Sequence, residues 1–105
     1  MIIIKTSSDE QGILEKICSI ILEKKLAGCA NIIPNCLSFF TWENKIQKNK
    51  ENLLLVKTLK INEAKVYNII KKFHNYKTPE IITLKVNNVE DDYFKWLTEV
   101  TEKND

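Results

Sequence analysis

Apolar and polar positions along the chain follow two periods, and each period predicts an element. The apolar run Ile2–Ile4 is short and unbroken, which is typical of a buried strand. A polar segment follows at once. Ser7 or Ser8 is expected to cap a helix there, with Glu10 or Gln11 three residues later completing a capping box. The chain is therefore predicted to begin with a strand that leads directly into a helix.

The predicted first helix carries a wide apolar stripe. Residues of the stripe recur at four-residue spacing, the pattern of a helix packed on a core. We expect the helix to run to about Ala27 and to end at Gly28, with Lys24 and Lys25 in its last turn, where cations suit the helix dipole. The stripe consists of Ile13, Leu14, Ile17, Cys18, Ile21, Leu22 and Leu26.

The middle of the chain predicts a long hairpin. Cys29 to Trp42 is expected to form one strand, bent or bulged at Pro34, because proline cannot donate a hydrogen bond to a central ladder. Glu43–Asn44 suits a tight turn, since asparagine tolerates positive φ. The chain then returns through a polar stretch, residues 45–52, into the apolar run Leu53–Val56.

The second half repeats the order of a helix followed by a strand. Asn62 is expected to cap a helix with an apolar face, and Thr78–Pro79 forces extended backbone after it. Residues 80–86 alternate as a strand does, and Asp91–Asp92 open a short final helix. The apolar faces of these two helices consist of Val66, Ile69, Ile70 and Phe73 in the first and of Tyr93, Trp96, Leu97 and Val100 in the second.

The predicted order is therefore β-α-β-β-α-β with an extra C-terminal helix. This is an α+β fold of the ferredoxin-like type, in which one antiparallel sheet is covered by two helices. A chain of 105 residues suits a single domain, and we assign one to residues 1–105.

The central hairpin is too long for the rest of this sheet. Residues 30–42 would span about 43 Å as a strand, whereas a first strand of about five residues reaches only about 17 Å. The distal part is nevertheless apolar on both faces, with Leu37 and Phe39 on one and Cys36, Phe40 and Trp42 on the other. An exposed apolar edge of this kind predicts pairing with another chain. The alternative is that the final helix folds over the hairpin, although one short helix cannot cover both faces.

The charged residues and the cysteines limit which binding partners and which cellular compartment the sequence favours. The net charge is +2, and the chain contains 16 lysines and no arginine. No guanidinium is therefore available for bidentate hydrogen bonds to phosphates or guanine edges. Three cysteines are an odd number with no Cys-x-x-Cys pair, which favours free thiols and a cytosolic location. No stretch approaches the roughly 20 apolar residues of a membrane span. We therefore expect neither a nucleic-acid nor a membrane partner.

Several functions found on this fold are disfavoured. RNA-recognition domains carry aromatic residues on the first and third strands, where this chain has Ile2–Ile4 and Leu53–Val56. Soft-metal chaperones carry Cys-x-x-Cys after the first strand, and acylphosphatases depend on an arginine. Only Gly12 and Gly28 are available, so a glycine-rich phosphate loop is not possible. No nucleophile is visibly paired with a base, and we predict that the protein is not an enzyme.

The candidate site residues are polar or contain sulfur. His74, the only histidine, lies at the end of the second predicted helix, where a lone imidazole is more often a cap than a ligand. Cys18 lies on the first helix's stripe and is expected to be a small core residue. Cys29 and Cys36 are seven apart in one strand, so they face opposite sides unless the bend at Pro34 restores their alignment.

Five segments in order resemble the CutA family, the divalent-cation tolerance proteins. The family carries a helix-to-strand motif, a Trp-Glu-Gly-Lys hairpin tip, an apolar third strand, a His-Pro-Tyr-x-x-Pro-Glu-Ile signature and a closing helix. In this chain Asn44 stands at the usual glycine and Asn75 at the usual proline, and both are compatible with the turns. The matching segments are Leu26–Pro34, Trp42–Ile46, Leu53–Thr58, His74–Ile82 and Tyr93 with Trp96–Leu97.

The resemblance implies an assembly and a role. The family is a ferredoxin-like homotrimer, similar in architecture to the PII signalling proteins, in which long hairpins reach across neighbouring subunits. It is linked to tolerance of copper and other divalent metals, and no enzymatic activity defines it. Its shared polar residues gather near clefts between subunits, and the corresponding positions in this chain are Cys29, Asn31, Trp42, Lys57, His74, Tyr76 and Glu80.

The resemblance also bears on metal ligands. Where metal-binding members carry a cysteine late in the first strand, this chain has Lys5, and where they carry a histidine pair, it has Phe73 and His74. One of three ligands is therefore present, which implies weak binding of copper or another divalent metal through His74 and an intersubunit cysteine, with Cys29 as the candidate. No other cofactor is expected.

Two functions follow from these observations. The first is a trimeric CutA-like protein of metal tolerance or homeostasis. The alternative is a PII-like signalling or scaffold trimer whose intersubunit clefts hold a small ligand or a protein partner. A screen of the purified trimer with metals, nucleotides and other metabolites distinguishes the two, whereas the mass of the assembly tests the trimer itself.

Overall fold

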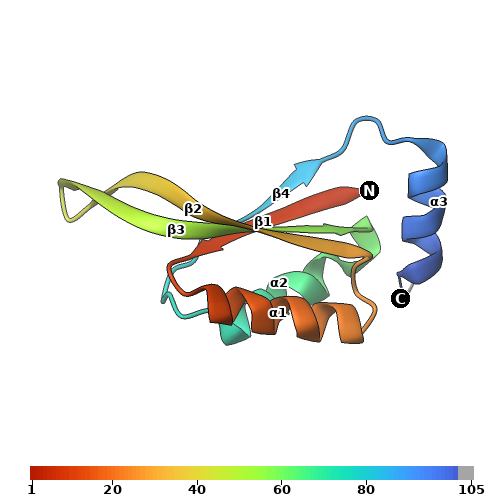
Figure 1. Ribbon diagram of the computed structural model, residues 1–105, viewed down its shortest axis with the longest axis horizontal. Helices are drawn as coiled ribbons and strands as arrows, with labels where there is room; N and C mark the ends of the chain where they lie inside the picture. The colour runs from red at the N-terminus through yellow and green to blue at the C-terminus, as the bar shows by residue number, and fades with distance from the viewer. Residues whose placement is uncertain (102–105) are drawn as a thin grey trace.

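Four strands form one antiparallel sheet in the order β2–β3–β1–β4, and helices lie against one of its faces (Figure 1). The structure, a computed structural model, describes residues 1–101. Its arrangement confirms the predicted α+β, ferredoxin-like fold. The elements are β1 (Ile2–Ser8), α1 (Gln11–Glu23), β2 (Cys29–Trp42), β3 (Lys45–Thr58), the 3₁₀ helix η1 (Lys60–Asn62), α2 (Glu63–Phe73), β4 (Ile81–Lys85) and α3 (Asp91–Val100).

The core lies between the sheet and the helix pair α1 and α2 (Figure 1). Alternate residues of β1 and β3 face the helices, as the two-residue period of a strand requires. The opposite side of the sheet, which we call the open face, has no helix of residues 1–101 lying across it. The buried apolar residues of the core are Ile2, Ile4, Leu14, Ile17, Ile21, Leu26, Ala27, Leu54, Val56, Val66 and Ile70.

The start of the chain differs from its prediction. β1 continues to Ser8, because residues 5–8 pair with β3 as far as Ser8 opposite Asn52. Ser7 and Ser8 therefore lie in the strand, and neither is the N-cap of α1. Glu10 holds that position, without a side-chain capping hydrogen bond.

The end of α1 was also predicted too late. The helix stops at Glu23, and Lys25 adopts a left-handed φ of 56°. The Leu26 N–H then donates to the Ile21 carbonyl, which closes the helix terminus. Gly28 therefore does not terminate the helix. It lies against α3, where a Cβ would overlap the side chain of Leu97.

The hairpin is longer than expected on its return side. Residues 45–52 were predicted as a polar connection, but they belong to β3 because each finds a partner across the ladder, from Trp42 opposite Lys45 to Cys36 opposite Glu51. Cross-strand pairing thus overrides their low strand propensity. Glu43 and Asn44, with φ of 51° and 61°, form the predicted two-residue turn.

A bulge near Pro34 interrupts β2 as predicted. The register moves from Ile33 opposite Leu53 to Cys36 opposite Glu51, so two residues of β2 face one of β3. Asn35 adopts a φ of 62° to permit it. The bulge places Cys36 on the open face and Leu37 and Phe39 on the opposite face of the distal hairpin, which comprises residues 36–51. This confirms the faces predicted for these residues.

The bulge also places Cys29 on the same face as Cys36. Cys29 lies opposite Lys57 and Cys36 opposite Glu51, and an even separation on β3 means a shared face. The bend therefore restores the alignment that simple alternation would break.

The later elements follow their predictions within a residue or two. Asn62 holds the N-cap position of α2, β4 covers Ile81–Lys85, and α3 begins at Asp91. Glu90 caps α3, a role that the sequence had not suggested.

α3 packs at the end of the sheet remote from the hairpin tip (Figure 1). Its Leu97 is buried beside Gly28, and the Lys57 ammonium lies 6.0 Å from the centre of the Tyr93 ring. The distal hairpin stays uncovered, with Phe39 64% and Ile46 81% exposed. The alternative in which the final helix folds over the hairpin is therefore wrong.

Candidate functional site

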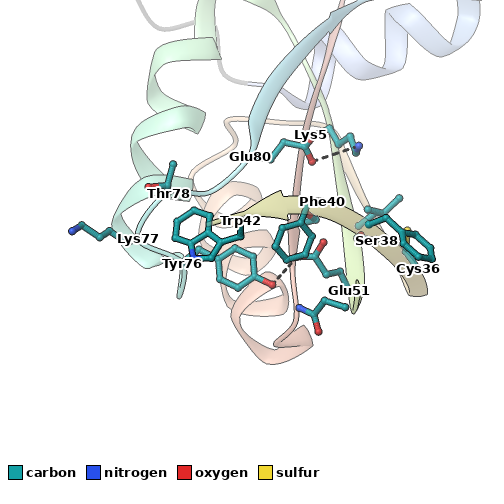
Figure 2. A pocket seen from close by; sticks show the side chains of 14 residues that line it. Lys5, Cys36, Ser38, Phe40, Trp42, Glu51, Tyr76, Lys77, Thr78 and Glu80 are labelled. Carbon is teal, nitrogen blue, oxygen red and sulfur yellow. Dashed lines mark hydrogen bonds and ion pairs between the residues drawn. The ribbon is translucent and has the colours of Figure 1, made fainter. Parts of the chain in front are cut away.

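A groove of about 740 Å³ opens under the distal hairpin, between β2, the end of β1 and the segment that precedes β4 (Figure 2). It combines aromatic and charged side chains. The residues that line it are Lys5, Ser7, Cys36, Ser38, Phe39, Phe40, Trp42, Asn49, Glu51, Leu53, Tyr76, Lys77, Thr78 and Glu80.

The apolar wall of the groove comes from the hairpin. Phe40 and Trp42 point to the open face because the bulge at Pro34 sets their alternation. Tyr76 reaches toward them from the segment after α2, as Figure 2 shows. Aromatic rings with a polar tip suit a surface that is covered on one side and wet on the other.

Two bonded pairs hold the polar groups of the groove (Figure 2). The Lys5 ammonium lies 3.5 Å from the Glu80 carboxylate. The Tyr76 hydroxyl donates to Glu51 Oε2 at 2.6 Å and accepts the N–H of Asp9 at 2.9 Å. Each carboxylate of the groove thus already has a partner within the chain.

Tyr76 stays protonated at neutral pH. Burial and the hydrogen bond to Glu51 raise the pKa of its phenol well above the ordinary range, although the Asp9 N–H acts in the opposite direction. The hydroxyl is therefore a donor, and it connects the turn before α1 to β3.

His74 lies behind Tyr76 with both ring nitrogens engaged. The Tyr76 N–H donates to Nδ1 at 3.0 Å, and Nε2 lies 2.8 Å from the carbonyl oxygen of Ser7. The two rings are tilted, with centres 5.0 Å apart. His74 thus ties the end of β1 to the segment that follows α2.

Asn75 extends this polar network. It accepts a hydrogen bond from the Ser8 hydroxyl at 2.5 Å and donates one to the Asp9 carboxylate at 2.8 Å. The Ser8 hydroxyl also accepts the N–H of Glu10. The side-chain amide of Asn75 therefore fixes the β1–α1 turn against the segment before β4.

The predicted cleft residues fall into separate groups. Trp42, Tyr76 and Glu80 line the groove. His74 accepts a hydrogen bond from the backbone N–H of Tyr76. The others gather at the opposite end of the open face: Cys29 lies opposite Lys57, with its Sγ 3.9 Å from the Asn31 Oδ1.

Sequence reasoning did not assign the rest of the groove to a site. Lys5 was noted only because it stands where metal-binding members of the family carry a cysteine. Glu51 was predicted to lie in the polar connection between two strands. The signal that could have found Glu51, Ser38 and Phe40 was strand alternation across the hairpin, read with the bulge at Pro34.

The predicted metal ligands do not meet within one chain. Cys29 lies beside Lys57, level with Ile3, whereas His74 bonds Ser7 at the other end of β1. Over residues 1–101, no group of three or more His, Cys, Asp or Glu side chains could hold a metal ion. A tight transition-metal site needs several such ligands.

Comparison with known proteins identifies the family. The model of the CutA1 divalent ion tolerance proteins matches residues 1–100. The divalent-cation tolerance protein CutA of Pyrococcus horikoshii is 36% identical over 103 residues, which cover 98% of this chain and 100% of that protein. No helix among residues 1–101 is long and apolar enough to cross a membrane.

Comparison with solved structures gives the same family as the comparison of sequences. CutA1 from Ehrlichia chaffeensis superposes with a TM-score of 0.90 at 33% identity, covering 96% of this chain and 94% of that one. The CutA of Archaeoglobus fulgidus, described as a periplasmic divalent cation tolerance protein, gives 0.91 at 35% identity over 97% and 100% of the two chains. With the family model matching nearly its whole length and these structures sharing its fold, the chain belongs to the CutA1 divalent ion tolerance protein family.

Proposed function

We propose that this protein acts in the tolerance of divalent cations, copper among them, as a non-catalytic homotrimer. The observation that carries the proposal is the family match over residues 1–100, together with relatives that are named for divalent-cation tolerance. We place the protein in the cytosol, because its three cysteines are free thiols.

The surface of the chain supports self-assembly. Ile33, Ile82 and Leu84 are exposed on the open face, and the distal hairpin adds further large apolar side chains. Exposed apolar surface continuous over a sheet and its projecting edge is typical of a subunit interface. The elongated shape, 45 × 26 × 21 Å, leaves the hairpin free to reach a neighbour.

Cation binding would be weak and shared between chains. Cys29 offers a half-buried thiol on the open face, beside the amide oxygen of Asn31. The chemistry of the donor set suits a soft cation only if further ligands come from another subunit. When bound, the metal would be the protein's cargo and would take part in no reaction.

The groove supports a second candidate function. A volume of about 740 Å³ lined by four aromatic side chains and several polar groups is typical of small-molecule sites. On this alternative, the trimer is a PII-like signalling or scaffold module that binds a metabolite or a protein partner there.

Growth in rising concentrations of copper sulfate tests the role directly. A host strain that lacks the chain should stop growing at a lower concentration than the same strain that carries it on a plasmid. Equal growth of the two strains with copper and with other divalent metals would contradict the tolerance role.

A thermal-shift screen of the purified protein distinguishes the two candidates. A ligand at a hundredfold excess over its dissociation constant adds about 2.7 kcal/mol to the free energy of unfolding. We expect Cu²⁺ or another divalent cation to raise Tm, and Cys29→Ser to reduce that rise while the matched variant Cys18→Ser leaves it unchanged. A rise in Tm with nucleotides or other metabolites alone would favour the ligand-binding module.

A further inference from the structure

We propose that His74 is a positioning residue that holds Tyr76 in the wall of the groove, and that it does not bind metal. The inference deepens the proposed function, since it rests on the groove as a functional surface and assigns the family's signature histidine to it. Three observations carry it: the hydrogen bonds of the ring, the anchoring of Tyr76, and the surroundings of the imidazole.

The hydrogen bonds leave the ring no free nitrogen. Nδ1 accepts the Tyr76 N–H, so it carries a lone pair and no proton. In the neutral ring the proton is then on Nε2, which donates to the carbonyl of Ser7. A cation could reach either nitrogen only by breaking one of these bonds.

The bond to Nδ1 forms a turn. A side-chain acceptor of residue 74 takes the N–H of residue 76, which is the pattern of an Asx-turn. The Nδ1 atom of histidine occupies nearly the position that the Oδ1 atom of asparagine would take. The bond fixes the backbone of Tyr76 where the chain leaves α2.

Tyr76 is fixed at its other end as well. Its hydroxyl lies between the Asp9 N–H and the Glu51 carboxylate, while its ring contacts that of His74. The ring between these anchors lines the groove, as the indole ring of Trp42 does (Figure 2). Loss of the His74 bond would release the backbone end of this arrangement.

The side chains next to His74 are engaged in other contacts. The adjacent side chains are Phe73, whose ring lies under the ammonium groups of Lys16 and Lys72, and Asn75, which is bonded to Ser8 and Asp9. Cations that already lie near this end of α2 do not favour another one. The part of the chain that the structure describes brings no set of metal-binding side chains together here.

Three variants separate the two roles. His74→Asn keeps an acceptor for the Tyr76 N–H but has no imidazole, whereas His74→Ala loses both. His74→Gln keeps a donor that can reach the Ser7 carbonyl. Amide hydrogen exchange at Tyr76 reports the turn without any metal, and Cu²⁺ titration by calorimetry reports ligation. The Ile17 amide, in the buried middle of α1, serves as the control for global folding.

We expect His74→Ala to speed exchange of the Tyr76 amide about fivefold or more, as the loss of one hydrogen bond predicts. His74→Asn should stay within about twofold of the wild type, and the Ile17 amide should be unchanged in both variants. The dissociation constant for Cu²⁺ should be the same within about twofold in all of these proteins.

Two results would overturn the proposal. One is a loss of Cu²⁺ affinity of about tenfold or more in both His74→Asn and His74→Ala, which is the signature of a lost imidazole ligand. The other is a Tyr76 amide that exchanges equally fast in the wild type and in His74→Ala. If the wild type binds no cation, the proposed cation binding fails, yet the exchange result still decides the role of His74.

Discussion

Cys18, Cys29 and Cys36 differ chemically because their surroundings differ. Cys18 packs from α1 against the core, and burial, followed by the charges of Glu15 and Cys29, raises the pKa of its thiol to about 11. Cys29 and Cys36 lie on the open face, half-buried and without α1 or α2 above them. The surroundings of each cysteine therefore decide whether its thiol can react or bind a metal.

Labelling of Cys18 tests this difference. In a Cys29→Ser/Cys36→Ser protein at about pH 8, the thiolate fraction of folded Cys18 is about 100-fold below that of the unfolded chain, and higher intrinsic nucleophilicity offsets only part of this loss. We expect a disulfide reagent to react at least about tenfold more slowly with the folded protein than in urea. The folded rate should rise with pH up to about 11, the pKa of the buried thiol. Equal rates in the folded and unfolded states would contradict the raised pKa.

At the scale of elements, α3 is capped at its first turn and packed against the α1–β2 connection near its other end. The Glu90 carboxylate accepts the N–H groups of Asp92 and Tyr93 at 3.0 Å each, which caps the first turn. Near the other end, Leu97 fills the space over Gly28, where the backbone of the α1–β2 connection comes close. The contact at Gly28 docks α3 at the end of the sheet, whereas the cap stabilises only the first turn of the helix.

Gly28→Ala should loosen this docking. The new Cβ would overlap Leu97 and lie 3.3 Å from the Thr101 hydroxyl, so α3 must shift. Overpacking of this kind costs about 1–3 kcal/mol in the free energy of unfolding. Gly12→Ala is the matched control, because its Cβ meets nothing within 4 Å and alanine favours a helix. Urea unfolding at a fixed protein concentration measures both variants, and equal stability of the two would contradict the close approach at Gly28.

The cap of α3 should weaken in acid. The backbone bonds to Asp92 and Tyr93 hold the pKa of Glu90 below its ordinary value. Because the folded pKa is the lower one, the stabilisation is fully present above the unfolded pKa and disappears as pH falls through the folded pKa. Protection of the Asp92 and Tyr93 amides should therefore drop in the wild type as pH falls below the ordinary range of a glutamate carboxyl and through the lower pKa of folded Glu90. Glu90→Gln should show a smaller drop, and identical pH profiles would refute the charge contribution.

At the scale of the whole molecule, two apolar surfaces meet. The open face and the distal hairpin are continuous along β2 and β3, and both lack cover within residues 1–101. Burial of such surface against other copies is the physical basis for the proposed trimer. The groove lies at the junction of these surfaces, so its ligand and its neighbouring subunit would share residues.

A charge on the open face should therefore weaken assembly. Leu84 lies on β4 opposite Ile3 and is 46% exposed, and Leu84→Lys would bury an ammonium in the interface. Leu22→Lys on α1 is the control, since Leu22 is similarly exposed, at 41%, on the helix side. Light scattering should give three chains for the wild type and Leu22→Lys, and a mass nearer one chain of 12.3 kDa for Leu84→Lys. Equal masses for the two variants would place the interface elsewhere.

The sequence alone determined the order and type of the elements. The helical stripe that includes Ile17 and Ile21, the turn at Glu43–Asn44 and the break at Pro34 each depend on neighbours within a few residues, so local patterns report them. The boundaries that failed, at Ser8 and in residues 45–52, depend on partners across the sheet. A strand whose residues are individually polar becomes visible only once its ladder is known.

Only the tertiary structure decided how the candidate site is built. Trp42, Tyr76 and Glu80 could be named from the resemblance, but nothing local indicated that Lys5 would pair with Glu80 or that Glu51 would bind the Tyr76 hydroxyl. The same holds for His74, whose hydrogen bond to Ser7 spans 67 positions of the chain. The role of a polar side chain depends on which donors and acceptors reach it, and those come from segments that only folding brings together.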